Sequence, residues 1–175
     1  MIIIKEAKVK DIKGIQEVFY KTWLETYPNK KAGITVEDVE AKYKDRFSEQ
    51  VISKRKAAIF DKSGKSLFLV AKDKNLVVGV CRLKKEELYN ELGAIYVLPD
   101  YQRQGIGRLF WEKAIIFFDD DKDIIVQVVA YNDKAINFYK KLGFVDTGKR
   151  FTQEKLRMPV SGNYLPEIEM VIKKS

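Results

Sequence analysis

The sequence predicts an α/β domain built around a mixed sheet, and three observations carry that prediction. Short β-branched runs alternate with segments of helical periodicity. The middle of the chain contains three consecutive strand-like runs joined by short turns. The chain has 175 residues, of which 46% are hydrophobic, which is enough to bury one sizeable core. We therefore expect a single domain over residues 1–175.

The N-terminal third is predicted to be a strand followed by helices. Ile2 to Ala7 is a short apolar run typical of a strand. Val9 to Tyr27 repeats apolar residues near helical spacing, which predicts a helix ended by Pro28. Thr35 supplies a capping residue ahead of early acidic residues, so a second helical region is expected from there to about Phe47, or on to Phe60.

The central segment changes to β periodicity. Leu67 to Lys72 and Leu76 to Leu83 predict a hairpin, and Glu91 to Val97 predicts a third strand. A glycine-rich turn then leads into a helical pattern, Arg108 to Phe118.

The C-terminal segment predicts one more helix between strands. Ile124 to Tyr131 is apolar and β-branched, which is typical of a strand buried on both faces. Asp133 to Leu142 is expected to be a helix ended by Gly143. Phe144 to Phe151 and Glu167 to Lys173 are expected to be the last two strands of the sheet.

Composition excludes several kinds of catalysis. The chain has no histidine and a single cysteine, Cys81. Ser-His-Asp and Cys-His catalysis are therefore impossible, and the usual zinc ligands are missing, so we expect no metal. Because Cys81 lies in the apolar run Val77 to Leu83, it is predicted to be a buried strand residue rather than a reactive thiol.

The net charge of +8 predicts attraction to anions, such as a phosphorylated cofactor or nucleic acid. The basic residues are scattered, which argues against a nucleic-acid stripe. No apolar run approaches the ~20 residues of a membrane span, and Met1 to Lys5 is too short for a signal peptide. We expect a cytoplasmic protein with no membrane partner.

The glycine-rich turn is the strongest functional signal. A turn of this kind between a strand and a helix leaves several backbone N–H groups unpaired at the positive end of the helix dipole, which suits an anion. It lacks the Lys-Ser/Thr of a P-loop and the third glycine of the dinucleotide fingerprint. The motif is Gln102-Arg103-Gln104-Gly105-Ile106-Gly107.

Two segments resemble the GCN5-related N-acetyltransferase (GNAT) family. The run from Ile95 to Leu109 is similar to its pyrophosphate loop, and Asn132 to Phe144 is similar to its Asn-x-x-Ala-x-x-Phe-Tyr-x-x-x-Gly-Phe pattern. The resemblance implies the acetyltransferase fold, which is a mixed, mostly antiparallel sheet splayed at the cofactor site and flanked by about four helices. It implies acetyl-CoA as cofactor, held by Tyr96, Val97, Gln102, Arg103, Gln104, Gly105, Ile106, Gly107, Arg108, Asn132 and Asn137.

The resemblance also implies catalytic roles. The backbone N–H of Val97 matches the group that polarises the thioester carbonyl, and Tyr139 matches the acid that protonates the leaving thiolate. Glu91 matches the base of some members, whereas other members use a water chain. Helix capping is the alternative role for Asn132, simple packing is the alternative for Tyr139, and an exposed edge carboxylate is the alternative for Glu91.

The acceptor is less defined. Trp23, Glu25 and Tyr27 lie in a segment that resembles the polyamine acetyltransferase branch, which implies transfer to a primary amine of a small molecule by direct attack in a ternary complex. A peptide N-terminus or a lysine is the alternative acceptor. A CoA-binding sensor or scaffold is the non-enzymatic alternative, and a homodimer is an open question.

Overall fold

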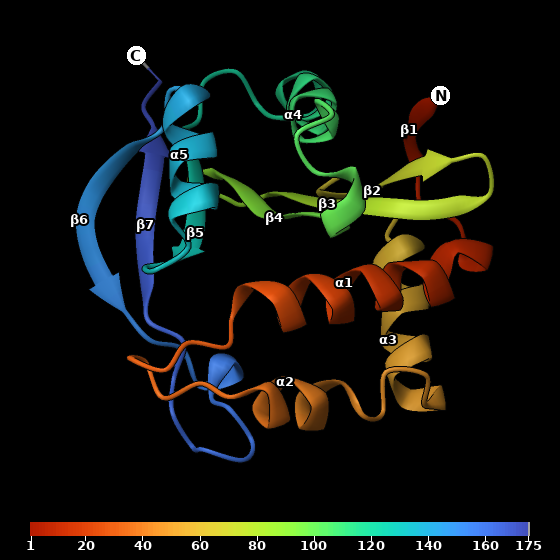
Figure 1. Ribbon diagram of the computed structural model, residues 1–175. Coiled ribbons are helices and arrows are strands. Elements are labelled where there is room, and N and C mark those ends of the chain that lie inside the picture. The colour runs from red at the N-terminus through yellow and green to blue at the C-terminus, as the bar shows by residue number, and fades with distance from the viewer. Residues whose placement is uncertain (175) are drawn as a thin grey trace.

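A seven-stranded mixed sheet runs through the computed structural model, which describes residues 1–174, with the backbone alone for Ala94 (Figure 1). The strand order is β1-β2-β3-β4-β5-β7-β6. The strands are β1 (Ile2–Glu6), β2 (Ser66–Asp73), β3 (Leu76–Lys85), β4 (Asn90–Val97), β5 (Ile124–Val129), β6 (Val145–Phe151) and β7 (Glu167–Ile172). The helices are α1 (Ile12–Thr26), α2 (Val36–Tyr43), α3 (Glu49–Ile59), α4 (Ile106–Phe117) and α5 (Asp133–Lys141). Short 3-10 turns are η1 (Val9–Asp11), η2 (Pro99–Tyr101) and η3 (Glu154–Leu156).

The helices cover the sheet in two layers. In Figure 1, α1, α2 and α3 lie below the sheet, α4 lies above it, and α5 lies alongside β5 and β7. The upper core contains Phe110 of α4 and Leu92 of β4, both fully buried. The lower core packs Ile15 and Val18 of α1 against Val80 of β3. The two faces of the sheet therefore pack into two separate cores, because successive side chains of a strand point to opposite faces.

The segment between α1 and β2 contains two helices, α2 and α3. The sequence predicted a single helical region there, ending at about Phe47 or at Phe60. Thr35 caps α2 by accepting a hydrogen bond from the Asp38 backbone N–H, and Ser48 caps α3 through the Val51 N–H. Two N-caps so close together start two helices, because a capping residue has an extended backbone that a continuous helix cannot include. The described chain thus has five α-helices rather than about four.

The prediction that β5 is buried on both faces is wrong at Gln127, which is exposed. Its side-chain oxygen accepts a hydrogen bond from Gln153 at 3.0 Å. At this point the face of β5 meets a polar side chain of the segment after β6 rather than the apolar core.

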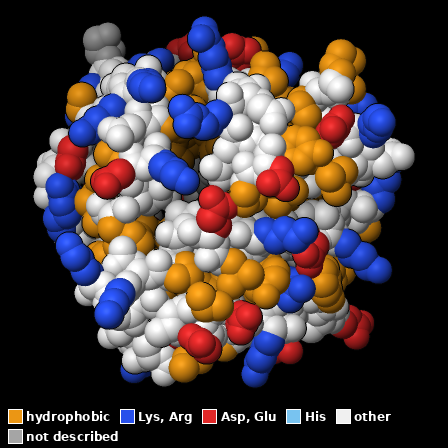
Figure 2. All heavy atoms as spheres, viewed as in Figure 1, with side chains coloured by type: hydrophobic (Ala, Val, Ile, Leu, Met, Phe, Trp, Pro, Cys, Tyr) orange, Lys and Arg blue, Asp and Glu red, His pale blue; other side chains and the backbone are white. Residues whose placement is uncertain are grey.

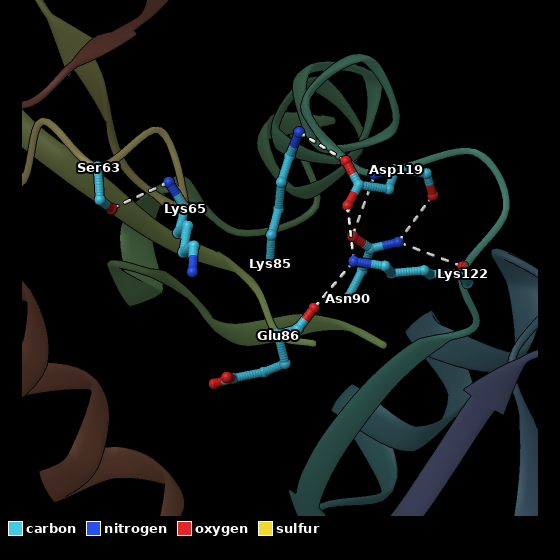
Figure 3. A network of polar contacts seen from close by, with 7 residues as sticks. All are labelled: Ser63, Lys65, Lys85, Glu86, Asn90, Asp119 and Lys122. Carbon is cyan, nitrogen blue, oxygen red and sulfur yellow. Dashed lines mark hydrogen bonds and ion pairs between the residues drawn. The ribbon is translucent and has the colours of Figure 1, made fainter. Parts of the chain in front are cut away.

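A buried polar network holds the start of β4 to the loop before β5 (Figure 3). The side chain of Asn90 is fully buried and donates to the backbone oxygens of Asp119 at 2.8 Å and Lys122 at 3.2 Å. Its oxygen accepts from the Asp119 N–H at 3.1 Å. The Asp119 carboxylate pairs with Lys85 at 2.8 Å and Lys122 at 3.0 Å, and these pairs lower its pKa. The network closes the sheet at the end where β4 and β5 pair.

On the face drawn in Figure 2, basic and acidic side chains are interspersed rather than segregated. Within residues 1–174, no helix combines the length and the apolar character needed to cross a membrane.

Candidate active site

The site is built on a splay between β4 and β5. These parallel strands pair over only three residues of β4, Asn90 to Leu92. In the pairing of β4 with β3, the register passes from Arg82↔Ala94 to Leu83↔Leu92, so Gly93 is an extra residue. A bulge of this kind bends its strand and increases the local twist. The bend turns the second half of β4 away from β5 and opens the sheet.

Unpaired backbone groups face this opening. The Leu98 N–H donates to the Val78 oxygen at 2.8 Å, so Leu98 directs its amide toward β3. Amide directions alternate along an antiparallel pair, and the N–H of Val97 therefore points away from β3, into the splay. On β5, the Ala130 N–H donates to Pro166 at 2.8 Å, so the amide of Val129 points into the splay from the other side. An extended molecule could pair with either strand there.

The glycine loop lies directly beyond β4. Gln102 donates from its side chain to the Val97 oxygen at 3.1 Å, which ties the loop to the strand end. Arg103 and Gly105 both have positive φ, +62° and +81°, and Gly105 is the N-cap of α4. A Cβ on Gly105 would meet no atom within 4 Å, so the space above it is open. The first amides of α4 face that space, a geometry that suits an anion.

The other loop residues have different surroundings. Ile106 is buried in the upper core, so it can offer only its backbone N–H to a ligand. Arg108 is 80% exposed and pairs with Glu112 at 3.3 Å. The Gln104 side chain donates to the Asp100 oxygen at 3.0 Å.

Gly107 has surroundings different from those of Gly105. Because neither glycine has a Cβ, the sequence predicts that both let a phosphate approach the backbone. A Cβ on Gly107 would instead lie 2.9 Å from Cζ of Phe138 on α5. The missing side chain at Gly107 therefore makes room for an aromatic ring between α4 and α5, and Gly105 alone opens toward a ligand.

Helix α5 supplies three of the predicted residues. Asn132 caps the helix, because its side-chain oxygen accepts from the Ala135 N–H at 3.1 Å, so the structure gives it the capping role that the sequence left as the alternative. Asn137 is exposed. Tyr139 is only 5% exposed and packs against Phe144. Its burial raises the pKa of the hydroxyl, so this phenol stays protonated.

The orientation of Tyr139 differs from the one that helical spacing predicts. Ala135, Phe138 and Leu142 recur at that spacing, which predicts that they face the core and that Tyr139 points toward the gap between the strands that end at Val97 and Tyr131. Tyr139 belongs to the same core cluster and is more buried than those three residues. Cys81 of β3 and Tyr96 of β4 are close enough to add to the rise in its pKa. Tyr139 therefore lies in the upper core, close to Tyr96 on the splayed part of β4.

Glu91 lies at the closed end of the splay, where β4 still pairs with β5. Its side chain is 28% exposed and pairs with Arg82 at 3.9 Å. Its neighbour Leu92 is buried in the upper core, so Glu91 projects toward the α1 side of the sheet.

The predicted acceptor residues separate into two groups. Trp23 and Tyr27 are 7% and 4% exposed and pack edge to face, with ring centroids 4.6 Å apart. The Tyr27 hydroxyl lies 3.0 Å from the hydroxyl of Tyr96, which binds α1 to the splayed end of β4. Glu25 instead lines a pocket of about 440 Å³ between α1 and the segment after β4, and it approaches Lys134 at 3.9 Å.

Comparison with known proteins decides the family. The acetyltransferase (GNAT) domain family matches residues 25–159. The chain belongs to the GNAT family of acetyltransferases. It is 30% identical over 152 residues to the uncharacterized N-acetyltransferase YuaI of Bacillus subtilis (strain 168), covering 80% of this chain and 78% of that protein. It is 31% identical over 83 residues to the peptidyl-lysine N-acetyltransferase YjaB of Salmonella typhimurium, covering 47% of this chain and 52% of that protein.

Solved structures of GNAT proteins share the fold. The PaiA N-acetyltransferase of Thermoplasma acidophilum, solved with coenzyme A, has a TM-score of 0.72 at 23% identity, and the match covers 99% of each chain. YncA of Salmonella typhimurium, solved with acetyl-CoA, has a TM-score of 0.62 at 18% identity, covering 100% of this chain and 95% of that one. The protein is thus an acyltransferase with the GNAT fold.

The site fits acetyl-CoA, the acetyl donor of the GNAT family. The open space above Gly105 faces the first amides of α4, which suits a pyrophosphate. The unpaired amides of Val97 and Val129 suit an extended, amide-bearing arm between the strands.

Sequence reasoning missed Gly93 and Arg82. A Cβ on Gly93 would lie 2.9 Å from Arg82 Nε, so the arginine lies across the bulge. An isolated glycine inside a strand pattern is a signal for a bulge, and it was present in the sequence.

Proposed function

We propose that this GNAT acetyltransferase moves the acetyl group of acetyl-CoA to a primary amine of a small molecule, by direct attack in a ternary complex. One observation carries the proposal. The N–H of Val97 points into the splay, and the buried Tyr139 lies near Tyr96, the residue before Val97, on the upper side of the sheet. A hydrogen-bond donor and an acid therefore flank the place where a thioester would lie.

The residues that would hold the cofactor divide by the part they meet. The loop from Gln102 to Arg108, with Arg103 and Gln104 at its rim, would bind the pyrophosphate through backbone amides and positive charge. Tyr96, Val97, Asn132 and Asn137 would line the arm, Asn132 through its amide nitrogen because its oxygen caps α5. When bound, acetyl-CoA supplies an acetyl group activated as a thioester.

Three groups would then act on the transfer. The Val97 N–H would donate to the carbonyl oxygen as negative charge develops on it, a contribution of ~3 kcal/mol. Tyr139 would give its proton to the sulfur as the carbon–sulfur bond breaks and the carbon–nitrogen bond forms. The proton of the amine would pass to Glu91, directly or through water. The position of Glu91 at the closed end of the splay favours the path through water.

The acceptor would enter from the α1 side. Glu25 is accessible in the pocket that Leu98 and Pro99 also line, immediately after Val97, and its carboxylate supports a cationic amine such as a polyamine. Trp23 and Tyr27 are buried, so they would shape the wall of the acceptor site rather than contact most of the acceptor.

The test is calorimetric titration with acetyl-CoA, followed by thiol release over spermidine, spermine, lysine, amino sugars and short peptides. We expect binding, and turnover on a small amine. Turnover on peptides alone would support the protein acetyltransferase alternative, and binding without turnover on any amine would support the CoA sensor. Gly105→Glu should abolish binding, because the new carboxylate would occupy the open anion site; retained micromolar affinity would contradict the loop assignment.

A further inference from the structure

Two guanidinium groups lie close together on the α1 side of the sheet, and within residues 1–174 only one carboxylate, that of Glu91, comes within ion-pair distance of either. The guanidinium of Arg55 on α3 lies over the rings of Phe19 and Phe68, with its Cζ 4.7 Å and 5.2 Å from the ring centroids. Its Nε donates to the Gln16 side-chain oxygen at 3.1 Å. No carboxylate within residues 1–174 comes within ion-pair distance of Arg55. A partly buried cation without an anion is unusual, because burying an unpaired charge is costly.

Arg82 is the second of these groups. Its guanidinium lies across Gly93, where a Cβ would come within 2.9 Å of Nε and 3.1 Å of Nη2. The side chain is 49% exposed, and Glu91 approaches it only at 3.9 Å, too far for a direct hydrogen bond. Phe68, whose ring carries Arg55, pairs in register with Arg82, so the two guanidinium groups occupy neighbouring positions on this face of the sheet. Burial and then the nearby charge of Arg82 lower the pKa of Arg55 to about 10. Within residues 1–174, the side chain of Arg55 makes one hydrogen bond, to Gln16, and that of Arg82 makes none.

The pair lies beside the proposed reaction centre. Arg82 pairs in register with Ala94, and Val80 pairs with Tyr96, so Arg82 lies along the splayed part of β4. Phe19, which carries Arg55 on its face, also contacts the ring of Tyr96 with centroids 5.3 Å apart. Tyr96 immediately precedes Val97, whose N–H faces the splay. A molecule held by the two arginines would therefore lie within reach of the thioester position.

The local charges match a zwitterion. The cluster has two guanidinium groups and one carboxylate, that of Glu91. The neighbouring Lys84 and Glu86 pair with each other and are not counted in it. An arginine offers a planar fork that binds a carboxylate through two parallel hydrogen bonds. Glu91 would attract the ammonium group of the same molecule. A polyamine has no anionic group for the arginines, and its cations would be repelled by them.

We propose that Arg55 and Arg82 bind a carboxylate of the acceptor, so that the acceptor is a carboxylate-bearing amine such as an amino acid. This inference rests on the proposed acetyl transfer and narrows its acceptor class. The pocket with Glu25 then serves as the entrance to the site rather than as the subsite that selects the acceptor.

The experiment compares acids with their amides. Thiol release is measured with saturating acetyl-CoA and each of the twenty amino acids, with the carboxamide of every amino acid that reacts, and with spermidine. The carboxamide of an amino acid keeps the amine and lacks the negative charge of the carboxylate that the arginines would bind. We expect the acid to exceed its amide in kcat/KM by roughly 10-fold to 100-fold, the range for losing a charge-assisted hydrogen-bonded pair.

Variants show whether the arginines cause the preference. Arg82→Gln should raise KM for the amino acid and leave KM for its amide and the Kd of acetyl-CoA unchanged, and Arg82→Lys should restore part of the loss. Arg55→Gln should act in the same direction. Arg82 is the decisive position because its half-exposed side chain can be replaced without opening the core. Arg150→Gln, on the exposed strand β6 and paired with Asp146, is the matched control and should change none of these constants.

Each alternative result is informative. Equal rates for acids and amides, or a preference for spermidine that the arginine variants do not alter, would overturn the carboxylate subsite and leave the small-amine acetyltransferase standing. Acetylation of peptides alone would overturn both the subsite and the small-amine acceptor. Failure to bind acetyl-CoA would overturn the proposed function itself.

Discussion

Replacing Asn90 by alanine should destabilise the protein strongly, because this side chain closes the sheet below the splay. The fully buried amide makes three hydrogen bonds, to the backbone oxygens of Asp119 and Lys122 and from the Asp119 N–H. Each lost bond costs ~1 kcal/mol net, and a buried donor left without a partner costs ~1–3 kcal/mol. We expect a loss of about 3 kcal/mol, which for a chain of this size lowers Tm by roughly 6–12 °C.

The assay is thermal unfolding followed by circular dichroism, with urea unfolding to obtain the free energy. Asn137→Ala is the control, because Asn137 is exposed on α5 and its change should stay within ~0.5 kcal/mol. Asn90→Asp should be at least as harmful as Asn90→Ala, because it keeps the shape but turns an anion toward two carbonyl oxygens. A Tm within 2 °C of the parent for Asn90→Ala would refute the reasoning, whose roughly 6–12 °C estimate depends on those bonds being buried.

Three further predictions concern the site and its supports. Tyr139→Phe should lower kcat, measured by thiol release, with little change in the Kd of acetyl-CoA, measured by calorimetry. Unchanged turnover would rule out the role of Tyr139 as the acid. Gly107→Ala should cost about 1–3 kcal/mol in urea unfolding, because the new Cβ meets the Phe138 ring at 2.9 Å, and the double variant with Phe138→Leu should recover part of that loss. Burial raises the pKa of Glu167 above its ordinary 4.5, so its contribution to stability is full below pH 4.5 and is lost as the pH rises through the higher native pKa. Glu167→Gln should therefore melt higher than the parent at pH 7 and lose that advantage below pH 4.5, and a gain independent of pH would contradict this account.

Much of the site could be predicted because its signals are local. The turn from Gln102 to Gly107 needs a left-handed backbone at Gly105, and glycine adopts that conformation at little cost. The strand before the turn and the helix after it follow from periodicity over a few residues. For the same reason, Tyr139 could be placed on a helix beside the loop, and Cys81 in a buried strand, where the structure has it fully buried.

The partners of individual side chains could not be predicted in this way. Gly105 and Gly107 look equivalent in the sequence, but one faces open space and the other faces the ring of Phe138. Asn132 has the residue type of a cofactor ligand and also that of a helix cap, and only the position of the Ala135 N–H distinguishes them.

The sequence by itself predicted most of the elements, the glycine-rich loop and the family, because turns, caps and periodicity depend on neighbours along the chain. Tertiary structure alone decided where β4 leaves β5 and which side chains meet there. One extra residue at Gly93 changes the register of β4 against β3, and a change of one residue moves every following side chain to the other face of the sheet. The packing of α3 places Arg55 over Phe68, which pairs in register with Arg82, and this proximity depends on long-range packing that has no local signal.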